Sequence, residues 1–268
     1  INLHGDKITK RTNYNLADLS RNSWMWITGK TAKGNENRSN GFEIGAERLV
    51  NDTTLVGIQY NKINSKMTEV ESGTGKFDTD MVSVYAVKKL GAWAVKPTLG
   101  YARTDYDLSR TITLAAVENF DAITYSNSYN TKGKSLWADL QVVAPKLWKV
   151  TPYTGLTVRK TEITGGTESG TTASQVTYSK YTDTSTQPYV GARFDSEPVT
   201  KGVFYSVDGR VTKFNLDNSF KYGDTLATIN ATVGYQLNER GQIFAGYQHQ
   251  TASQYNNNMV NIGAKIDF

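Results

Sequence analysis

The stretch from Asn257 to Phe268, NNMVNIGAKIDF, limits the fold classes open to this chain. Every second residue of its last nine positions is apolar, and these residues are Val260, Ile262, Ala264, Ile266 and Phe268. The residues between them are Asn261, Gly263, Lys265 and Asp267. A period of two predicts a β-strand with one apolar and one polar face. Such a strand fits a soluble sandwich, with its apolar face on a core, or an outer-membrane barrel, with that face on lipid.

The composition favours strands and excludes several function classes. The 268 residues include 23 glycines and 16 tyrosines but only 5 prolines, and no cysteine is available for a disulfide or a thiolate metal site. No run of about 18 apolar residues predicts a membrane-spanning helix. The net charge of +5 is scattered rather than concentrated in a basic patch, so nucleic-acid binding is not predicted. The chain begins at Ile1 without a signal segment, as expected for a mature product or a piece of a longer protein.

Period-two patterning and turn residues predict twelve strands. They are 23–31, 40–50, 53–65, 76–89, 92–106, 133–144, 147–162, 185–195, 202–215, 224–237, 240–252 and 257–268. Most exceed the usual 5 or 6 residues of soluble strands and suit the roughly 9 to 11 that a tilted transmembrane strand needs. Short links alternate with longer polar loops such as 107–132 and 163–184. We therefore predict an all-β fold in which 23–268 form one 12-stranded antiparallel transmembrane β-barrel with both ends at the periplasmic side.

Residues 1–22 lack the period-two pattern. Leu16 and Leu19 are three apart and Asp6 is a plausible N-cap, which predicts an α-helix. A twelve-stranded barrel has a lumen too wide for side chains alone to fill. Glycines on the polar faces of many strands would leave room for this helix inside the barrel, although they would equally ease the bending of strands.

The polar faces of the strands carry charged residues that we expect to line the lumen. These are Glu43, Glu47, Asp139, Arg159, Arg193, Asp208 and Arg210. The simpler interpretation is a solvated wall. The more specific one is that the four carboxylates pair with basic residues of the helix, because charges in a confined lumen are screened less than those on an open surface. Those basic residues are Lys7, Lys10 and Arg11.

Trp93 and Trp148 occupy matched positions in a weak repeat, Trp-x-Val-x-Pro-x-x-Gly. Both follow a short link, so we expect them in the periplasmic aromatic girdle, where amphipathic rings favour the interface. Ordinary core tryptophans are the alternative for a soluble protein.

Catalysis and metal binding have little support in the sequence. The only two histidines are His4, in the N-terminal segment, and His249, on the apolar face of its strand. No serine lies near His249 at the spacing of a Ser–His hydrolase. We predict no enzymatic activity, no cofactor and no metal site.

The chain resembles the translocator (β-barrel) domain of a monomeric autotransporter of type V secretion. The resemblance covers essentially all 268 residues and rests on the helix-like lead, the aromatic first strand Ser23-Trp24-Met25-Trp26, twelve alternating strands and the terminal Val-x-Ile-x-Ala-x-Ile-x-Phe. It implies a monomeric pore in the outer membrane of a Gram-negative bacterium, in contact with outer-membrane lipid. That pore would export a passenger domain lying before Ile1, with residues 1–22 as a pore-spanning helix.

The same resemblance implies insertion by the outer-membrane assembly machinery with the help of periplasmic chaperones. The apolar residues of the last strand, Val260 to Phe268, would be the assembly signal. Relatives that cut themselves inside the barrel use an Asn-Asn pair in the helix, whereas this chain offers only Asn13-Tyr14-Asn15. Cleavage of that type is therefore not predicted. A diffusion porin with an open lumen and no passenger is the alternative function.

Overall fold

The computed structural model describes residues 23–268 except 36, 71–72, 115–122, 197–200, 215–224, 239 and 254. The predicted helix, and with it the division between 1–22 and the barrel, falls outside the described residues. Within them the chain is β-structure, with one short 3-10 turn at Thr172–Ser174 and no α-helix.

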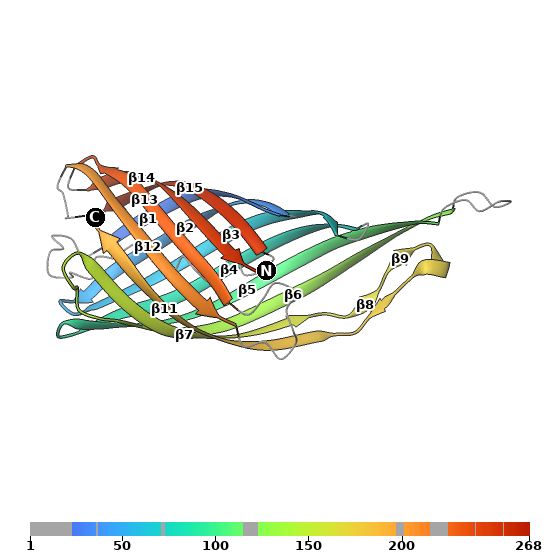
Figure 1. Ribbon diagram of the computed structural model, residues 1–268, viewed down its shortest axis with the longest axis horizontal. Helices are drawn as coiled ribbons and strands as arrows, with labels where there is room; N and C mark the ends of the chain where they lie inside the picture. Colours follow the sequence, from blue (N-terminus) through green and yellow to red (C-terminus); the bar gives the residue numbers. More distant parts are fainter. Residues whose placement is uncertain are drawn as a thin grey trace.

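Twelve long antiparallel strands form a closed barrel (Figure 1). In chain order they are β1 (Ser23–Gly34), β2 (Asn37–Asn51), β3 (Thr54–Val70), β4 (Gly73–Leu90), β5 (Trp93–Leu114), β6 (Ile123–Val143), β7 (Val150–Ile163), β11 (Tyr181–Asp195), β12 (Gly202–Lys213), β13 (Thr225–Gln236), β14 (Gly241–Ala252) and β15 (Tyr255–Asp267). Each strand pairs with its neighbour along the chain, and β15 pairs with β1 to close the ring. The predicted fold class is confirmed.

Closure follows from the terminal strand. The β1–β15 register runs from Trp24 opposite Asp267 to Gly34 opposite Asn257. The other edge of β15 is bonded along β14. Both edges of this last strand are therefore paired, which is a requirement in hydrocarbon because lipid offers no hydrogen-bond partners to the backbone.

The two faces of the strands reverse the pattern of a soluble protein. Outward positions are apolar and open, with Ile27, Leu99 and Ile262 exposed by 54%, 59% and 68%. Inward positions are polar and buried, as at Gln59, Thr228 and others. An apolar outer band of this kind is the surface that a transmembrane barrel presents to lipid.

Inward glycines lie directly across from inward aromatic residues on the adjacent strand. The pairs are Gly45–Trp26, Gly57–Tyr85, Gly100–Trp137, Gly155–Tyr189, Gly191–Tyr153, Gly234–Phe204 and Gly263–Phe244. A Cβ atom at any of these glycines would overlap the opposite ring. The space beside the glycines is thus filled by the wall itself, and these glycines do not by themselves argue for a segment inside the barrel.

Strands β5 and β6 extend far beyond their neighbours and project from the barrel as a hairpin (Figure 1). Their register continues to Leu114 opposite Ile123. The prediction of a loop over 107–132 is therefore wrong for most of its length. Beyond the membrane the outward side chains become polar, so the sequence loses the apolar alternation by which strands are recognised.

The connection between β7 and β11 also has structure of its own. It contains β8 (Gly166–Thr167), β9 (Ser169–Gly170) and β10 (Thr177–Tyr178). Strands β8 and β10 pair with each other, and β9 pairs with β6 at Asn127 and Ser128. We call residues 164–180 the mouth loop. It lies at the end of the barrel opposite the short turns, beside the projecting hairpin (Figure 1).

Candidate functional site

The lumen wall formed by β1 to β4 carries two buried carboxylates. Glu43 accepts hydrogen bonds from the Trp26 indole, at 2.9 Å, and from Lys30. Glu47 accepts hydrogen bonds from the Trp24 indole and the Tyr85 hydroxyl. Both side chains point inward, and each already has two donors within the wall.

The opposite wall gathers Asp139 and Asp208 around a pair of tyrosines. Tyr189 donates to Asp139 at 3.1 Å and Tyr153 donates to Asp208 at 2.9 Å. The two rings meet edge to face, with centroids 6.2 Å apart. Thr157 completes the bonding of Asp139 at 2.6 Å. These two carboxylates, far apart in the sequence, thus belong to one cluster, whereas Glu43 and Glu47 belong to another.

The basic residues of the lumen lie against aromatic rings. The Arg210 guanidinium lies 4.9 Å from the Tyr189 ring centroid and the Arg159 guanidinium 5.4 Å from that of Trp137. Such cation–π contacts hold a flexible cation against the wall. Arg193 instead pairs with Asp195 through Nε at 2.7 Å. The seven predicted lumen residues therefore all face inward, but the aromatic partners that hold many of them were not predicted.

The apolar residues of the last strand face outward. Val260, Ile262, Ile266 and Phe268 are 47% to 68% exposed, and Ala264 lies in the same row. On the inward face Lys265 pairs with Asp267 at 2.9 Å near the end of the barrel. The basic residues Lys7, Lys10 and Arg11 lie outside the described residues.

The two predicted girdle tryptophans lie at the short-turn end. Trp93, which is 51% exposed, begins β5 on its outward face directly after the turn at Gly91. Trp148 differs from its prediction, because it lies in the turn itself rather than within a strand. Leu147 pairs with Val150 around it, and its φ is +59° with 99% of the residue exposed. A left-handed backbone is unusual for a bulky residue and is normally taken by glycine at such a turn.

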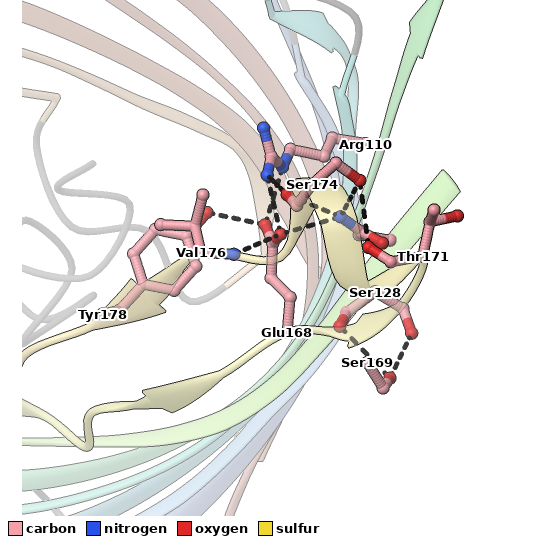
Figure 2. Close-up of polar contacts among 9 residues, drawn as sticks. Arg110, Ser128, Glu168, Ser169, Thr171, Ser174, Val176 and Tyr178 are labelled. Atoms are coloured by element: carbon pink, nitrogen blue, oxygen red, sulfur yellow. Dashed lines mark hydrogen bonds and ion pairs between the residues drawn. The ribbon is translucent and has the colours of Figure 1, made fainter. Parts of the chain in front are cut away.

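A hydrogen-bond cluster at the mouth centres on Glu168 (Figure 2). The Arg110 guanidinium of β5 binds its carboxylate with two bonds, Nε to Oε1 at 2.7 Å and Nη2 to Oε2 at 2.8 Å. Asn127 of β6, the Val176 amide and the Tyr178 hydroxyl donate to the same carboxylate at 3.2, 3.1 and 2.9 Å. Only 3% of the Glu168 side chain is exposed.

This cluster fastens the mouth loop to the face of the hairpin that continues the lumen wall. Arg110 and Asn127 have the parity of the inward positions of β5 and β6. Tyr178 adds a ring contact to Tyr129, with centroids 4.8 Å apart. Hydrogen bonds from the Arg110 guanidinium hold the pKa of the Glu168 carboxyl at about 2, below its ordinary value of 4.5. The cluster was missed from the sequence because its members come from three separate segments.

Two kinds of feature are absent from the residues that the structure describes, namely metal-holding clusters and membrane-spanning helices. No group of three or more His, Cys, Asp or Glu side chains among them is placed to hold a metal ion. His249 lies on the outward face of β14 and contacts Asn258 at 2.9 Å. The described part of the chain also has no helix with the length and hydrophobicity needed to cross a membrane.

Solved structures with the same fold include two autotransporter barrels. The translocator domain of NalP from Neisseria meningitidis is 14% identical, with a TM-score of 0.79, over 94% of this chain and 91% of that one. The β domain of the Bordetella autotransporter BrkA is 16% identical, with a TM-score of 0.63, over 92% and 99%. The toluene transporter TodX from P. putida is 5% identical, with a TM-score of 0.54, over 94% and 91%. At these identities the likeness concerns the fold.

The family model supplies the assignment that the structural likenesses cannot. No curated protein matches the sequence. The model of the autotransporter β-domain matches residues 22–248, which is most of the chain and nearly all of the barrel. This is a family of outer-membrane transport pores rather than of enzymes, and the passenger that such a pore exports is part of the same polypeptide. The chain belongs to the autotransporter β-domain family and is an outer-membrane β-barrel translocator.

Proposed function

We propose that residues 1–22 run through the lumen as a helix that links the barrel to its passenger. The observation that supports this is a lumen wall with inward charged side chains on both sides: the buried Glu43 and Glu47 on one, and the partly buried Asp139 and Asp208 on the other. A segment rich in lysine and arginine suits such a wall. Glu43 and Glu47 already accept hydrogen bonds from the wall. We therefore propose that they attract Lys7, Lys10 and Arg11 mainly through long-range electrostatics rather than through direct hydrogen bonds.

Single-channel conductance tests this arrangement. Deleting residues 1–22 should raise the conductance of the purified protein in planar bilayers several-fold, because the lumen would open. The double variant Glu43→Lys, Glu47→Lys should raise it in the same direction by loosening the segment. A matched control, Asp78→Lys with Asp105→Lys, reverses two charges on exposed strand positions away from the lumen and should leave conductance unchanged. If neither lumen variant changes conductance, the segment does not occupy the pore.

We further propose that the short-turn end, with Ser23 and Phe268, faces the periplasm and that Trp93 and Trp148 lie in the interface there. The mouth loop and the long hairpin would then face outward. Because the chain has no cysteine, single cysteines report position cleanly. An impermeant maleimide should label Gln175→Cys in intact cells and spare Lys149→Cys. The reverse labelling would show the opposite orientation.

The outer-membrane assembly machinery and periplasmic chaperones complete the proposal. They would recognise the outward row of the last strand from Val260 to Phe268 before the barrel closes. Two observations support this part of the proposal: the chain belongs to the autotransporter β-domain family, and the last strand closes the barrel by pairing with β1.

A further inference from the structure

Three lysines from separate segments converge on one carboxylate on the outward face of the barrel. Lys134 of β6, Lys160 of β7 and Lys180, which precedes β11, place their Nζ atoms 3.3, 3.1 and 3.2 Å from the carboxylate oxygens of Glu162. We call these three lysines the lysine patch. Their side chains are 61%, 56% and 63% exposed, whereas that of Glu162 is 18% exposed.

The lysine patch has more positive charge than its carboxylate can neutralise. One carboxylate facing three ammonium groups leaves a local surplus of two positive charges. Two other outward cations near this level each have one carboxylate partner: Lys62 pairs with Asp80 and Arg103 with Asp105, each at 3.6 Å. The surplus at Glu162 is a charge that an external anion can neutralise.

The distance of the lysine patch from the short turns can be compared with the height of the apolar band that faces lipid. Lys134 lies nine residues along β6 from Val143, the end of that strand at the short turns. At about 3.3 Å per residue this is about 30 Å along the strand, or about 23 Å along the barrel axis for a tilt near 40°. The apolar band of an outer-membrane barrel is about 25 Å tall. The lysine patch thus lies near the edge of the apolar band that is farther from the short turns.

Apolar side chains continue directly below the patch. Leu136 and Leu140 of β6 are 60% and 50% exposed, and Leu156 and Val158 of β7 are 42% and 41% exposed. In the register Leu136 lies opposite Lys160, and Ala138 opposite Val158. The lysine patch therefore borders a strip of exposed apolar side chains along β6 and β7.

We propose that the lysine patch binds a phosphate group of the phosphorylated glycolipid (lipid A) that forms the outer leaflet of this membrane. A lysine ammonium acts on phosphate as a point charge, and a phosphate carrying about −1.5 to −2 charges matches a surplus of two. The Glu162 carboxylate competes with the phosphate for the three lysines. The leaflet rests on the orientation given under Proposed function, but binding by the purified domain does not depend on it.

Titration of the purified domain with lipid A in neutral detergent micelles, followed by native mass spectrometry, tests this site. The triple variant Lys134→Gln, Lys160→Gln, Lys180→Gln should weaken binding on the order of 100-fold, since each cation near an anionic lipid surface contributes about a factor of five. The control Lys62→Gln, Lys66→Gln, Lys76→Gln removes the same charge from β3 and β4 and should change binding by less than about threefold. Glu162→Gln removes the competing carboxylate and should tighten binding about fivefold.

Each outcome distinguishes a specific phosphate site from general charge attraction. Equal loss in both triple variants would mean general charge attraction and would overturn the proposal, as would unchanged binding in the lysine-patch variant. Lipid A lacking its phosphates should bind the wild type as weakly as intact lipid A binds the lysine-patch variant; equal binding with and without phosphate would also overturn it. Heat-modifiable electrophoretic mobility confirms that each variant is a folded barrel. If the triple variant does not fold, Lys180→Gln alone, outside any strand, should still weaken binding about fivefold.

Discussion

Replacing Glu168 by glutamine should release the mouth loop from the hairpin without affecting the barrel. The carboxylate accepts two bonds at Oε1 and three at Oε2. Whichever oxygen becomes the amide nitrogen, at least two of these bonds are lost, one of them from Arg110. A hydrogen bond to a charged group contributes about 1.5–3 kcal/mol and a neutral one about 1 kcal/mol.

We take the lower end of these values, because water reaches the donors once the loop moves away. The variant should therefore cost about 2–3 kcal/mol of docking free energy, which lowers the ratio of docked to undocked loop roughly 30- to 150-fold. The cost stays local, since the loop lies outside the ring of barrel strands.

Hydrogen exchange of the backbone amides from 166 to 178 measures this ratio. The matched control is Ser169→Ala, in the same loop, which loses the 2.9 Å bond to the Ser128 hydroxyl and should change exchange by less than about fivefold. Exchange in Glu168→Gln within threefold of wild type would refute the role of the cluster. An equal fall in the stability of the barrel would show that the loop is part of the barrel's cooperative unit.

Three further predictions concern pH, packing and assembly. Because the pKa of Glu168 is depressed from 4.5 to about 2, its contribution to loop docking should be complete above pH 4.5 and vanish as the pH falls through about 2; loss of protection already at pH 5 would contradict this. Gly100→Ala should lower the free energy of unfolding by about 1–3 kcal/mol, because the new Cβ would overlap the Trp137 ring. Gly209→Ala, with open space around the new Cβ, should raise the free energy of unfolding by about 0.5–1 kcal/mol. Equal effects of the two variants in urea titrations would contradict the packing argument. Deleting Phe268 should reduce insertion in cells several-fold while the urea midpoint of the barrel that does form changes little, and normal insertion would deny the terminal residue a role in assembly.

The transmembrane part of the fold was predictable because lipid imposes a strict period of two on the outward face. The strand from 257 to 268 and the pairing of the last strand with the first followed from that constraint, and the structure confirms them. The extension of β5 and β6 was not predictable, because no lipid selects apolar residues there.

The side chains of the lumen were predictable in direction but not in partner. Glu43 and Asp139 face inward as their parity indicates, yet their bonds to Trp26 and Tyr189 depend on register between strands. The inward glycines were noticed, but the ring opposite each one becomes visible only when the strands are aligned. The Glu168 cluster depends on a loop that folds back on β5 and β6, for which the sequence contains no local signal.

Display of a reporter fused before Ile1 tests the export function most directly. A small, readily unfolded reporter should be digested by protease added to intact cells, because the translocator carries it to the surface. In a second culture the same reporter joined to a chain lacking β15 should be protected, because the ring cannot close without that strand. If the reporter stays protected while the barrel is inserted and heat-modifiable, this domain does not export the polypeptide that precedes it.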